Sequence, residues 1–398
     1  MEKVKVIDSI MGSGKTEWAI AYMNTNRHKR FIYITPFNDE IESRILPRCS
    51  GFVTGNTGSK FQDFKRLLRM GKNIAATHEC FKMADEETRN LIEAQGYTLI
   101  LDEVMEVIQD IKLSPADIAT VLERHADIEE ENGSLIWTDT NYKADGRFYD
   151  IRKMSESGGL IAVTDPNGKC NFLLWLFPSE IFKSFDEVYL LTYLFDSQLH
   201  KAYFDLNCIP FEKWRVVKIG SGYEIIPHDG VTDDKIQIKI DIYEGALNSI
   251  GKNLASLSAS WFKSRKNKSL QESLANNMYN FFRNICNAKS KEVLWTCFKT
   301  AEKGMKKGGF SKGFAVCNIR ATNKFRDRTA VAYCVNIYMR PVIKNYFASR
   351  GVSIDEDGYA LSEMLQFLWR SALRQGKEIR LYIPSSRMRG LLQKWIQG

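Results

Sequence analysis

Residues 4–17 combine a short apolar segment with a glycine-rich loop that could bind phosphate. The stretch reads Val-Lys-Val-Ile-Asp-Ser-Ile-Met-Gly-Ser-Gly-Lys-Thr-Glu. Its two glycines let backbone N–H groups turn toward phosphate oxygens with no Cβ in the way. The lysine amine can contact the β- and γ-phosphates, and the threonine hydroxyl can ligate Mg²⁺. We expect a nucleoside triphosphate and Mg²⁺ to bind Ser9, Met11, Gly12, Ser13, Gly14, Lys15 and Thr16.

One position departs from the general pattern of such loops. The pattern has glycine six residues before the lysine, and this chain has Ser9 there. The alternative interpretation is a glycine-rich turn that caps an ordinary helix. The ending Gly-Ser-Gly-Lys-Thr is intact and lies between a strand pattern and a helix pattern, which favours the nucleotide site.

Two adjacent carboxylates form a second candidate for chemistry. Asp102 and Glu103 follow the apolar run Leu-Ile-Leu. Asp102 could hold Mg²⁺ directly or through water, and Glu103 could polarise the water that attacks the γ-phosphate. The alternative is an acidic helix N-cap, because such pairs are common after strands. Their place in the same pattern as the phosphate loop favours NTP hydrolysis.

The elements that must position these residues alternate between strands and helices. Near-continuous apolar strands of this kind are typical of a parallel sheet covered on both faces. A β-rich insertion at about 111–187 interrupts the alternation, and its two best strands flank the turn Pro-Asn-Gly. A short strand is expected from residue 4 into the phosphate loop, and further strands at 31–36, 73–78, 97–103, 134–138, 159–165, 171–177 and 187–192.

A second α/β pattern follows the first. Strands are expected at 293–298, 313–318 and 379–383, and helices at 328–350 and 362–375. A chain of 398 residues exceeds the usual size of one core, so two domains are expected. We place the first domain at 1–205, with the insertion, and the second at 206–398.

Charge is distributed unevenly along the chain. Residues 1–250 carry 29 Lys and Arg against 39 Asp and Glu, whereas residues 251–398 carry 27 against 9. A basic half of this kind points to a polyanionic partner, and nucleic acid is favoured over a merely solvated basic surface. The eight scattered cysteines form no metal-binding spacing, and neither a membrane span nor a signal peptide is expected. The expected location is the cytoplasm, or the host cytoplasm if a phage encodes the chain.

Seven short segments follow one another along the chain in a recognisable order. They are Gly-Ser-Gly-Lys-Thr at 12–16, Ile-Thr-Pro at 34–36, Ala-Thr-His at 76–78, Leu-Asp-Glu at 101–103, Leu-Thr-Tyr-Leu-Phe-Asp at 191–196, Asn-Ile-Arg-Ala-Thr-Asn at 318–323 and Gln-Phe-Leu-Trp-Arg-Ser-Ala-Leu-Arg at 366–374. In this order they resemble the motifs of superfamily 2 DNA helicases. The forms at 190–196 and 320–323 are most similar to those of the small helicase-like ATPases of tailed bacteriophages.

The resemblance implies two tandem RecA-like domains with parallel sheets and an ATP site in the interdomain cleft. Lys15, Asp102 and Glu103 would be catalytic, with Thr16 and Asp102 holding Mg²⁺. Gln366, Arg370 and Arg374 would act from the second domain, one arginine stabilising charge in the transition state. The family places its arginines four and seven residues after the glutamine. Here they follow it by four and eight, so the choice between Arg370 and Arg374 stays open.

The resemblance also implies a surface for nucleic acid. His78 could instead be a structural histidine at a strand end, and the second-domain residues could instead sense the nucleotide. The residues that would touch the sugar-phosphate backbone are Thr35, Pro36, Thr77 and His78 in the first domain, and Arg320, Thr322 and Asn323 in the second.

The function expected from these features is an ATP-dependent DNA helicase or translocase of phage-type replication or recombination. Single-stranded or forked DNA is favoured over RNA, and replication or recombination proteins are candidate partners. Only eight residues precede Ser9, so no adenine-recognition segment is expected and NTPs other than ATP could serve. The alternatives are a translocase, remodeller or packaging ATPase without strand separation, and a nucleotide-switched DNA-binding protein that is not a motor.

Overall fold

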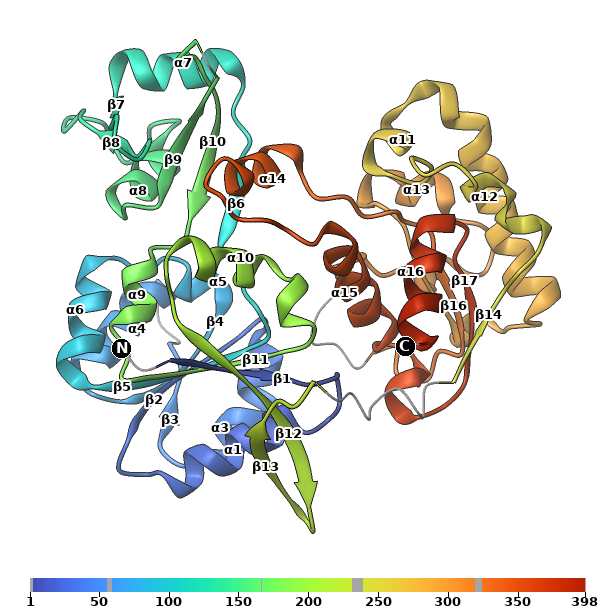
Figure 1. Cartoon of the computed structure of the whole chain (residues 1–398), viewed down its shortest axis with the longest axis horizontal. Helices are drawn as coiled ribbons and strands as arrows, with labels where there is room; N and C mark the ends of the chain where they lie inside the picture. Colours follow the sequence, from blue (N-terminus) through green and yellow to red (C-terminus); the bar gives the residue numbers. More distant parts are fainter. Residues whose placement is uncertain (1–2, 56–58, 166, 231–238, 319–323, 398) are drawn as a thin grey trace. The chain divides into compact units, whose positions relative to one another are not determined.

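The computed structural model describes the whole chain except residues 1–2, 56–58, 166, 231–238, 319–323 and 398 (Figure 1). The chain forms two compact units, which are described separately. The first comprises Met1–Ser9, Ser13–His228 and Arg340–Ile354, and the second Ile10–Gly12, Asp229–Met339 and Asp355–Gly398.

The first unit is built around an eight-stranded sheet. Its strands are β1 (Val4–Asp8), β2 (Arg30–Thr35), β3 (Phe52–Val53), β4 (Asn73–Thr77), β5 (Tyr97–Asp102), β11 (Glu187–Thr192), β12 (Phe211–Ile219) and β13 (Gly222–Pro227). They lie in the order β13-β12-β1-β11-β5-β2-β4-β3, and only β12 and β13 pair antiparallel. The carboxyl ends of the parallel strands therefore share one edge, where the residues that follow them meet.

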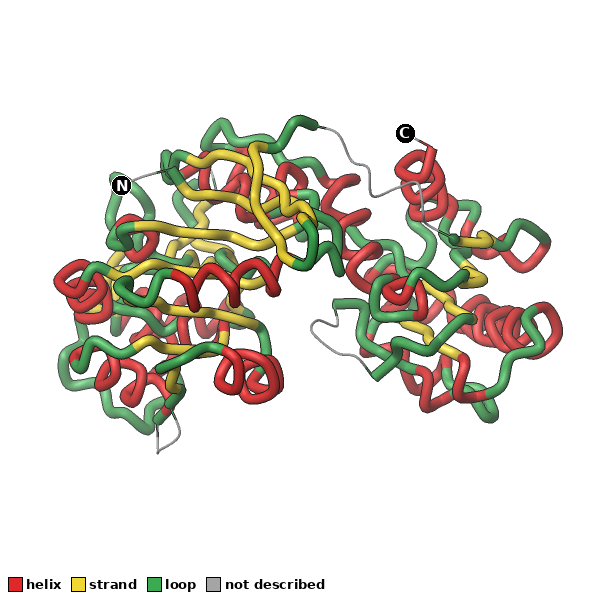
Figure 2. Tube along the Cα trace, turned by 90° about the horizontal axis from the view of Figure 1, so that it is seen from below, coloured by secondary structure: helices red, strands yellow, loops and turns green. Residues whose placement is uncertain are grey.

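Helices cover both faces of this sheet. One face carries α1 (Lys15–Thr25), α2 (Asn38–Glu40), the π-helix η1 (Ile41–Ile45) and α3 (Leu46–Arg48); the other carries α4 (Lys60–Arg69), α5 (His78–Phe81), α6 (Glu86–Gln95), α9 (Ser179–Lys183) and α10 (Leu199–Leu206) (Figure 1). Figure 2 shows helices (red) flanking the strands (yellow). Every residue of β5 is buried, as expected for a strand covered on both sides. The α1 face packs Trp18 and Met23 against Tyr33 and Tyr189.

The expected insertion is present between β5 and β11. Its elements are β6 (Ile108–Ile111), α7 (Pro115–Arg124), β7 (Ala126–Ile128), β8 (Leu135–Trp137), α8 (Tyr149–Glu156), β9 (Leu160–Thr164) and β10 (Cys170–Leu176). Strands β6, β10 and β9 form an antiparallel sheet, β7 and β8 a second, smaller one. A separate hydrophobic core that includes Val121, Leu135 and Leu173 holds these sheets and both helices together.

A segment from late in the sequence belongs to this unit. Helix α14 (Pro341–Ala348) contacts β6 of the insertion. Arg340 forms an ion pair with Asp110, and the guanidinium of Arg350 donates a hydrogen bond to the carbonyl oxygen of Asn132. Strands β12 and β13 also extend the first sheet, so the expected division after residue 205 lies inside the first unit.

The second unit contains a four-stranded parallel sheet in the order β14-β17-β16-β15. Its strands are β14 (Ile240–Ile242), β15 (Val293–Thr296), β16 (Ala330–Tyr333) and β17 (Ile379–Tyr382). Its longer helices are α12 (Lys268–Asn280), α15 (Glu356–Leu368) and α16 (Ser386–Gln397). Shorter ones are η4 (Ala246–Gly251), α11 (Ala259–Lys263), η5 (Arg265–Asn267), η6 (Phe281–Ile285), η7 (Ser290–Glu292), η8 (Lys299–Ala301), α13 (Glu302–Met305), η9 (Ser311–Gly313) and η10 (Ala372–Gln375).

The α/β class with parallel sheets is confirmed, but three elements of the second half were predicted wrongly. The helix expected at 328–350 is strand β16 followed by a separate α14 that begins at a proline. The strand expected at 313–318 is reduced to one bridge between Phe314 and Trp295. The helix expected at 362–375 starts earlier and ends at Leu368. Among the described residues, no helix is long and apolar enough to cross a membrane.

Candidate nucleotide-binding site and nucleic-acid face

The phosphate loop connects the end of β1 to the start of α1. Gly12 and Gly14 have positive φ angles of 85° and 104°, which residues with a Cβ rarely adopt. A Cβ on Gly14 would lie 2.1 Å from the ring of Tyr223 on β13. Glycine at position 14 is therefore required by the backbone conformation and by the close approach of this ring.

The departure at Ser9 has a structural explanation. The φ angle of Ser9 is not positive, so the backbone at this position does not need glycine. The Ser9 hydroxyl accepts a hydrogen bond of 2.9 Å from the backbone N–H of Val216 on β12. The Ser9 N–H donates to the Thr192 carbonyl oxygen at 3.0 Å. The serine thus joins the start of the loop to the strands that flank β1.

The groups around the loop suit a triphosphate with a divalent cation. The Lys15 amine donates a hydrogen bond to the Ser9 carbonyl oxygen, which keeps it over the loop. Helix α1 has no side-chain N-cap, so its first N–H groups are available to an anion. The Ser13 hydroxyl oxygen is buried and has no hydrogen-bond partner among the described residues. A phosphate oxygen would satisfy these donors.

The carboxylate pair lies at the end of β5, next to the loop. The Thr16 hydroxyl donates a 3.0 Å hydrogen bond to Oδ2 of Asp102. The two expected Mg²⁺ ligands are therefore already in contact. Burial raises the pKa of Asp102, and hydrogen bonds from Tyr33 and Thr16 oppose that rise. Glu103 has a φ of 66°, a conformation uncommon for residues other than glycine, and its N–H donates to the Leu191 carbonyl oxygen at 3.0 Å.

Sequence reasoning missed the role of Tyr33. This side chain is fully buried on β2, and its hydroxyl donates a hydrogen bond to Oδ2 of Asp102. Burial and the neighbouring carboxylate raise its pKa well above the ordinary value, so the hydroxyl stays protonated and acts as a donor. A tyrosine in an apolar strand looks like an ordinary core residue, and only the alignment of β2 beside β5 reveals this contact.

Two further contacts connect the expected motifs. His78 is buried, and its Nε2 lies 3.3 Å from the carbonyl oxygen of Asp102. The Asp8 carboxylate accepts a 3.1 Å hydrogen bond from the N–H of Phe195, within the segment that resembles the helicase linker motif. Burial raises the pKa of Asp8, while that hydrogen bond lowers it. Both contacts place the ends of β4 and β11 beside the phosphate loop and the carboxylates.

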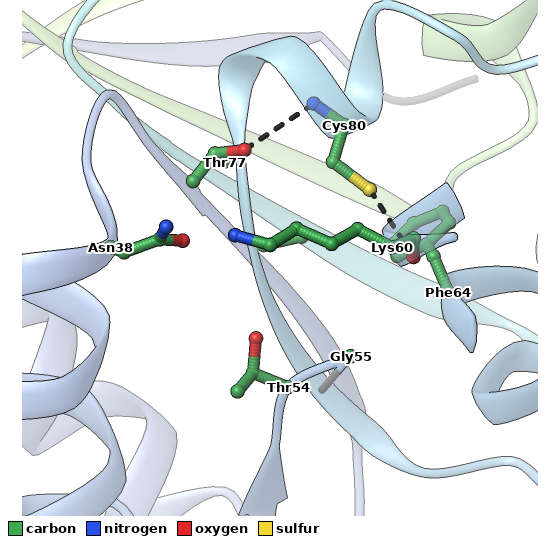
Figure 3. A pocket seen from close by; sticks show the side chains of 8 residues that line it. Asn38, Thr54, Gly55, Lys60, Phe64, Thr77 and Cys80 are labelled. Atoms are coloured by element: carbon green, nitrogen blue, oxygen red, sulfur yellow. Dashed lines mark hydrogen bonds between the residues drawn. The ribbon is translucent and has the colours of Figure 1, made fainter. Parts of the chain in front are cut away.

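The expected nucleic-acid residues of the first unit differ in exposure. Thr35 and His78 are buried, whereas Pro36 and Thr77 are half-buried. Thr77 lines a small hollow of about 10 Å³ at the carboxyl ends of β2, β3 and β4. In Figure 3 the Lys60 side chain extends toward Asn38, with Thr77 and Thr54 on either side. Asn38, Thr54 and Lys60 were not expected from the sequence; Lys60 is the exposed first residue of α4.

The remaining expected residues lie in the second unit or outside the described residues. Gln366 is half-buried on α15, Arg370 is buried just after this helix, and Arg374 is exposed in η10. Since α15 ends at Leu368, the two arginines do not share a helix. Their role toward the nucleotide stays a prediction. Arg320, Thr322 and Asn323 lie outside the described residues.

The fold is similar to that of solved XPD structures. One is Xpd4 of S. tokodaii, with 13% identity, a TM-score of 0.50 and coverage of 99% of this chain and 94% of that chain. A second, titled XPD_APO, has 10% identity, a TM-score of 0.51 and coverage of 98% and 95%. At these identities the likeness concerns the fold alone, and it agrees with the expected α/β architecture.

Sequence comparison gives a nearer relative. A family model described as the YonV C-terminal Rossmann-like domain matches residues 234–396. The SPbeta prophage-derived uncharacterized protein YonV of Bacillus subtilis (strain 168) is 41% identical over 417 residues, with 100% of each chain covered. With this identity over the full length of both proteins, the chain belongs to the YonV family.

Proposed function

We propose that this protein hydrolyses ATP, and other NTPs, to drive its movement along DNA. The observation that carries the proposal is the contact between Thr16 and Asp102, which joins the phosphate loop to the carboxylate strand. Lys15 is held over the same loop, and Glu103 follows Asp102 directly. The XPD-like fold and the order of the motifs support a helicase-type motor.

Each of these residues would have a separate role in hydrolysis. Lys15 and the N–H groups at the start of α1 would neutralise the phosphates. A bound Mg²⁺, held by Thr16 and Asp102, would stabilise the negative charge that develops on the phosphate oxygens. Glu103 would accept a proton from the attacking water, which joins the γ-phosphorus as the bond to the β-phosphate oxygen breaks. We assign the arginine that stabilises the transition state to Arg370 or Arg374 by the resemblance.

The nucleic acid would bind at the hollow lined by Lys60, Thr77, Asn38 and Thr54. A lysine charge with hydroxyl and amide groups suits a backbone phosphate, and such contacts do not depend on the base. His78 is buried and contacts the carbonyl of Asp102, so we assign it to coupling between this face and the carboxylates. Pro36 and Thr35 would shape the strand end beside it. Arg320, Thr322 and Asn323 would contact the strand from the second domain.

The relative supports a proposal for the biological setting. Its printed name describes that protein as prophage-derived, and we propose that the present chain acts in phage DNA replication or recombination. Single-stranded or forked DNA is the proposed substrate. Replication or recombination proteins are the proposed partners. The insertion, with its own core, is our candidate for the wedge that separates strands.

A forked-duplex unwinding assay, run beside ATPase measurements with single-stranded DNA, duplex DNA and RNA, tests the proposal. The wild type should hydrolyse ATP faster with DNA and should separate the fork. Lys15→Ala should lose nucleotide binding, and Glu103→Gln should bind nucleotide but lose hydrolysis by at least about 100-fold. DNA-stimulated hydrolysis without unwinding would instead support a translocase, remodeller or packaging ATPase. Hydrolysis that does not respond to DNA, with nucleotide-dependent DNA binding, would support the nucleotide-switched binding protein.

A further inference from the structure

A second hollow lies at the opposite ends of the same strands of the first unit. It has a volume of about 370 Å³ and is lined by five basic side chains, Arg27, His28, Lys29, Arg30 and Lys72. Arg27, His28 and Lys29 lie in the turn between α1 and β2, Arg30 is the first residue of β2, and Lys72 precedes β4. We call this site the basal hollow. It faces away from the carboxyl strand ends that carry the phosphate loop.

Most of the positive charge of the basal hollow is not balanced by carboxylates. Lys29 pairs with Glu187. The Arg27 Nε donates to the Asn24 carbonyl oxygen at 3.1 Å, and the Arg30 Nη1 donates to the Gln95 carbonyl oxygen at 2.8 Å. Neither of these arginines, nor Lys72, forms an ion pair with any described residue. Three positive charges therefore lie together, unpaired by acid, on one surface.

This concentration of charge is unexpected for this part of the chain. Residues 1–250 carry 29 Lys and Arg against 39 Asp and Glu, so basic side chains have abundant acidic residues to pair with. Many basic side chains of the first unit do so, as in the pairs Arg48–Glu17 and Lys65–Asp85. The basal hollow is distinguished by three basic side chains that form no such pair with a described residue and line the same hollow. Their positive charges together favour the binding of an external anion.

The lining determines which anion fits. It consists of the basic side chains, Asn73 and two glycines, with no aliphatic side chain and no Phe, Tyr or Trp. A nucleobase could stack only on the His28 imidazole or on an arginine guanidinium plane, so a free nucleotide would be held mainly through its phosphates. A polymer of phosphates can contact several cations at once and release the counterions it carried. The chemistry therefore favours a nucleic-acid backbone over a small nucleotide.

The position of the basal hollow also agrees with binding of a nucleic-acid backbone. Both hollows lie next to the edge strand β3. Gly51, just before this strand, lines the basal hollow, and Thr54 and Gly55, just after it, line the hollow that contains Lys60. The distance along β3 between the two sites is about 13 Å at roughly 3.3 Å per residue. About four nucleotides of a duplex strand, at roughly 3.4 Å each, span that distance.

We call the hollow lined by Asn38, Thr54, Lys60 and Thr77 the strand-end face. We propose that the basal hollow binds backbone phosphates of the DNA that continues beyond the strand-end face, through Arg27, Lys72 and Arg30. The inference rests on the proposed function, because it extends the path of the same nucleic acid around the β3 edge of the sheet. The contact is independent of base sequence. It lengthens the bound tract and adds to the salt dependence of binding.

Fluorescence anisotropy of a labelled forked DNA, titrated at several salt concentrations, tests the proposal. The test variant is Arg27→Gln/Lys72→Gln; Arg30 is kept because it also bonds a backbone carbonyl. Removing two phosphate contacts should make the slope of log K against log salt shallower by about 1.5 and should weaken binding by about 10-fold or more. The control is Lys3→Gln/Lys218→Gln, which removes two exposed lysines that form no ion pair with a described residue and should leave the slope unchanged.

A third variant, Lys60→Gln, distinguishes the proposed DNA contact at Lys60 from the proposed DNA contact at the basal hollow. If it weakens DNA binding while Arg27→Gln/Lys72→Gln behaves as the wild type, the strand-end face stands and the basal hollow is overturned. If the wild type binds no nucleic acid, both are overturned. An equal loss in the control double variant would show a general effect of net charge and would also reject the hollow. Thermal unfolding of each variant verifies that all of them fold.

Discussion

The hydroxyl of Tyr33 and the carboxylate of Asp102 are joined by a hydrogen bond inside the core of the first unit. Thr16 donates to the same carboxylate oxygen, Oδ2. Two donors therefore hold one oxygen of the residue expected to ligate Mg²⁺. These donors fix the orientation of the buried carboxylate and oppose the rise in its pKa that burial causes, and a metal ligand needs both a set orientation and a negative charge.

Replacing Tyr33 by Phe removes this donor and leaves the ring in place. Mutation of a group that orients a metal ligand typically lowers metal affinity by about 10–100-fold. The Mg²⁺ concentration for half-maximal nucleotide binding should therefore rise by roughly 10-fold. A fluorescent nucleotide titrated with Mg²⁺ measures this. Tyr97→Phe is the matched control, because Tyr97 is equally buried and donates to the Lys72 carbonyl oxygen at 2.9 Å, away from the site. Equal Mg²⁺ dependence in Tyr33→Phe and the wild type would contradict the role.

The contact between Ser9 and Val216 leads to a second prediction. Ser9→Ala leaves the buried N–H of Val216 without its acceptor, so the free energy of unfolding should fall by about 1–3 kcal/mol. Ser9→Gly, which restores the general loop pattern, should be destabilised at least as much. Urea titration measures both. Ser13→Ala is the control: its hydroxyl has no hydrogen-bond partner among the described residues, and the change should stay within about 0.5 kcal/mol.

Much of the site could be predicted because its main groups are local in sequence. A phosphate loop needs a strand, two glycines and a helix start within a short stretch, and Asp102 closes an apolar strand in the same alternating pattern. Tyr33 and Lys60 carry no such local sign. Their roles arise because parallel strands bring their carboxyl ends to one edge, and periodicity does not say which side chains face each other there.

The second half was harder to predict for a related reason. All of Ala330–Tyr333 is buried, so β16 shows no alternation and resembles a buried helix segment. Pro341 starts a new helix, which the continuous apolar reading of 328–350 overlooked. The assignment of α14 to the first unit depends on contacts such as Arg340–Asp110, between residues far apart in sequence.

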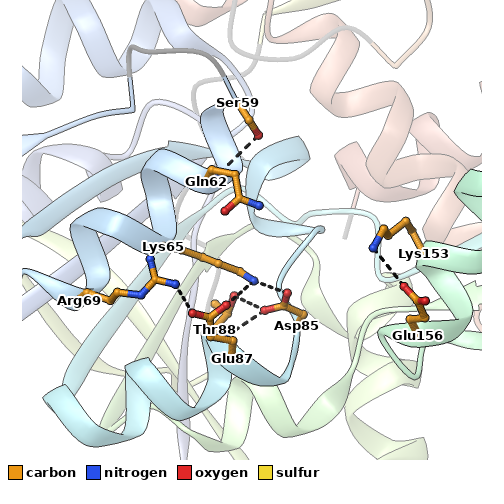
Figure 4. Close-up of polar contacts among 9 residues, drawn as sticks. All are labelled: Ser59, Gln62, Lys65, Arg69, Asp85, Glu87, Thr88, Lys153 and Glu156. Atoms are coloured by element: carbon orange, nitrogen blue, oxygen red, sulfur yellow. Dashed lines mark hydrogen bonds and ion pairs between the residues drawn. The ribbon is translucent and has the colours of Figure 1, made fainter. Parts of the chain in front are cut away.

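The ion pairs of Lys65 give a third prediction. This lysine on α4 has a side chain only 8% exposed and bonds Asp85 and Glu87 near the start of α6 (Figure 4). Burial alone would raise the pKa of Asp85, but hydrogen bonds from Lys65 and Thr88 lower it. Lys65→Met should reduce the free energy of unfolding by about 1–2 kcal/mol, less than for a fully buried pair because both carboxylates can rehydrate.

Figure 4 also contains the control for this change, the pair Lys153–Glu156. The Lys153 side chain is 57% exposed, so Lys153→Met should change stability by less than about 0.5 kcal/mol. Urea titration of both variants compares them directly. Similar losses in the two would show that burial of Lys65 contributes nothing. Because α4 begins with Lys60, the Lys65 variant should also weaken DNA binding at the strand-end face.

The last prediction concerns Glu17, the residue after Thr16. Its carboxylate accepts hydrogen bonds from Arg48 at 2.5 and 3.0 Å and from Arg44 at 3.0 Å, which fasten α1 to the segment before β3. The Arg48 hydrogen bond lowers the pKa of Glu17 from 4.5 to about 2. A carboxylate with a lowered folded-state pKa stabilises the protein above its unfolded value, and that stability is lost as the pH falls through the folded one.

Glu17→Gln should therefore be less stable than the wild type at pH 7, and the difference should shrink as the pH falls from about 4.5 toward 2. The difference at pH 7 should be about 0.5–1 kcal/mol, since the side chain is 36% exposed and water screens the pair. Urea titrations at pH 7, 4.5 and 3.5 measure it. Arg48→Gln should show the same trend, because it removes the main donor. A difference that stays constant with pH would mean that the loss comes from packing and not from the ion pairs.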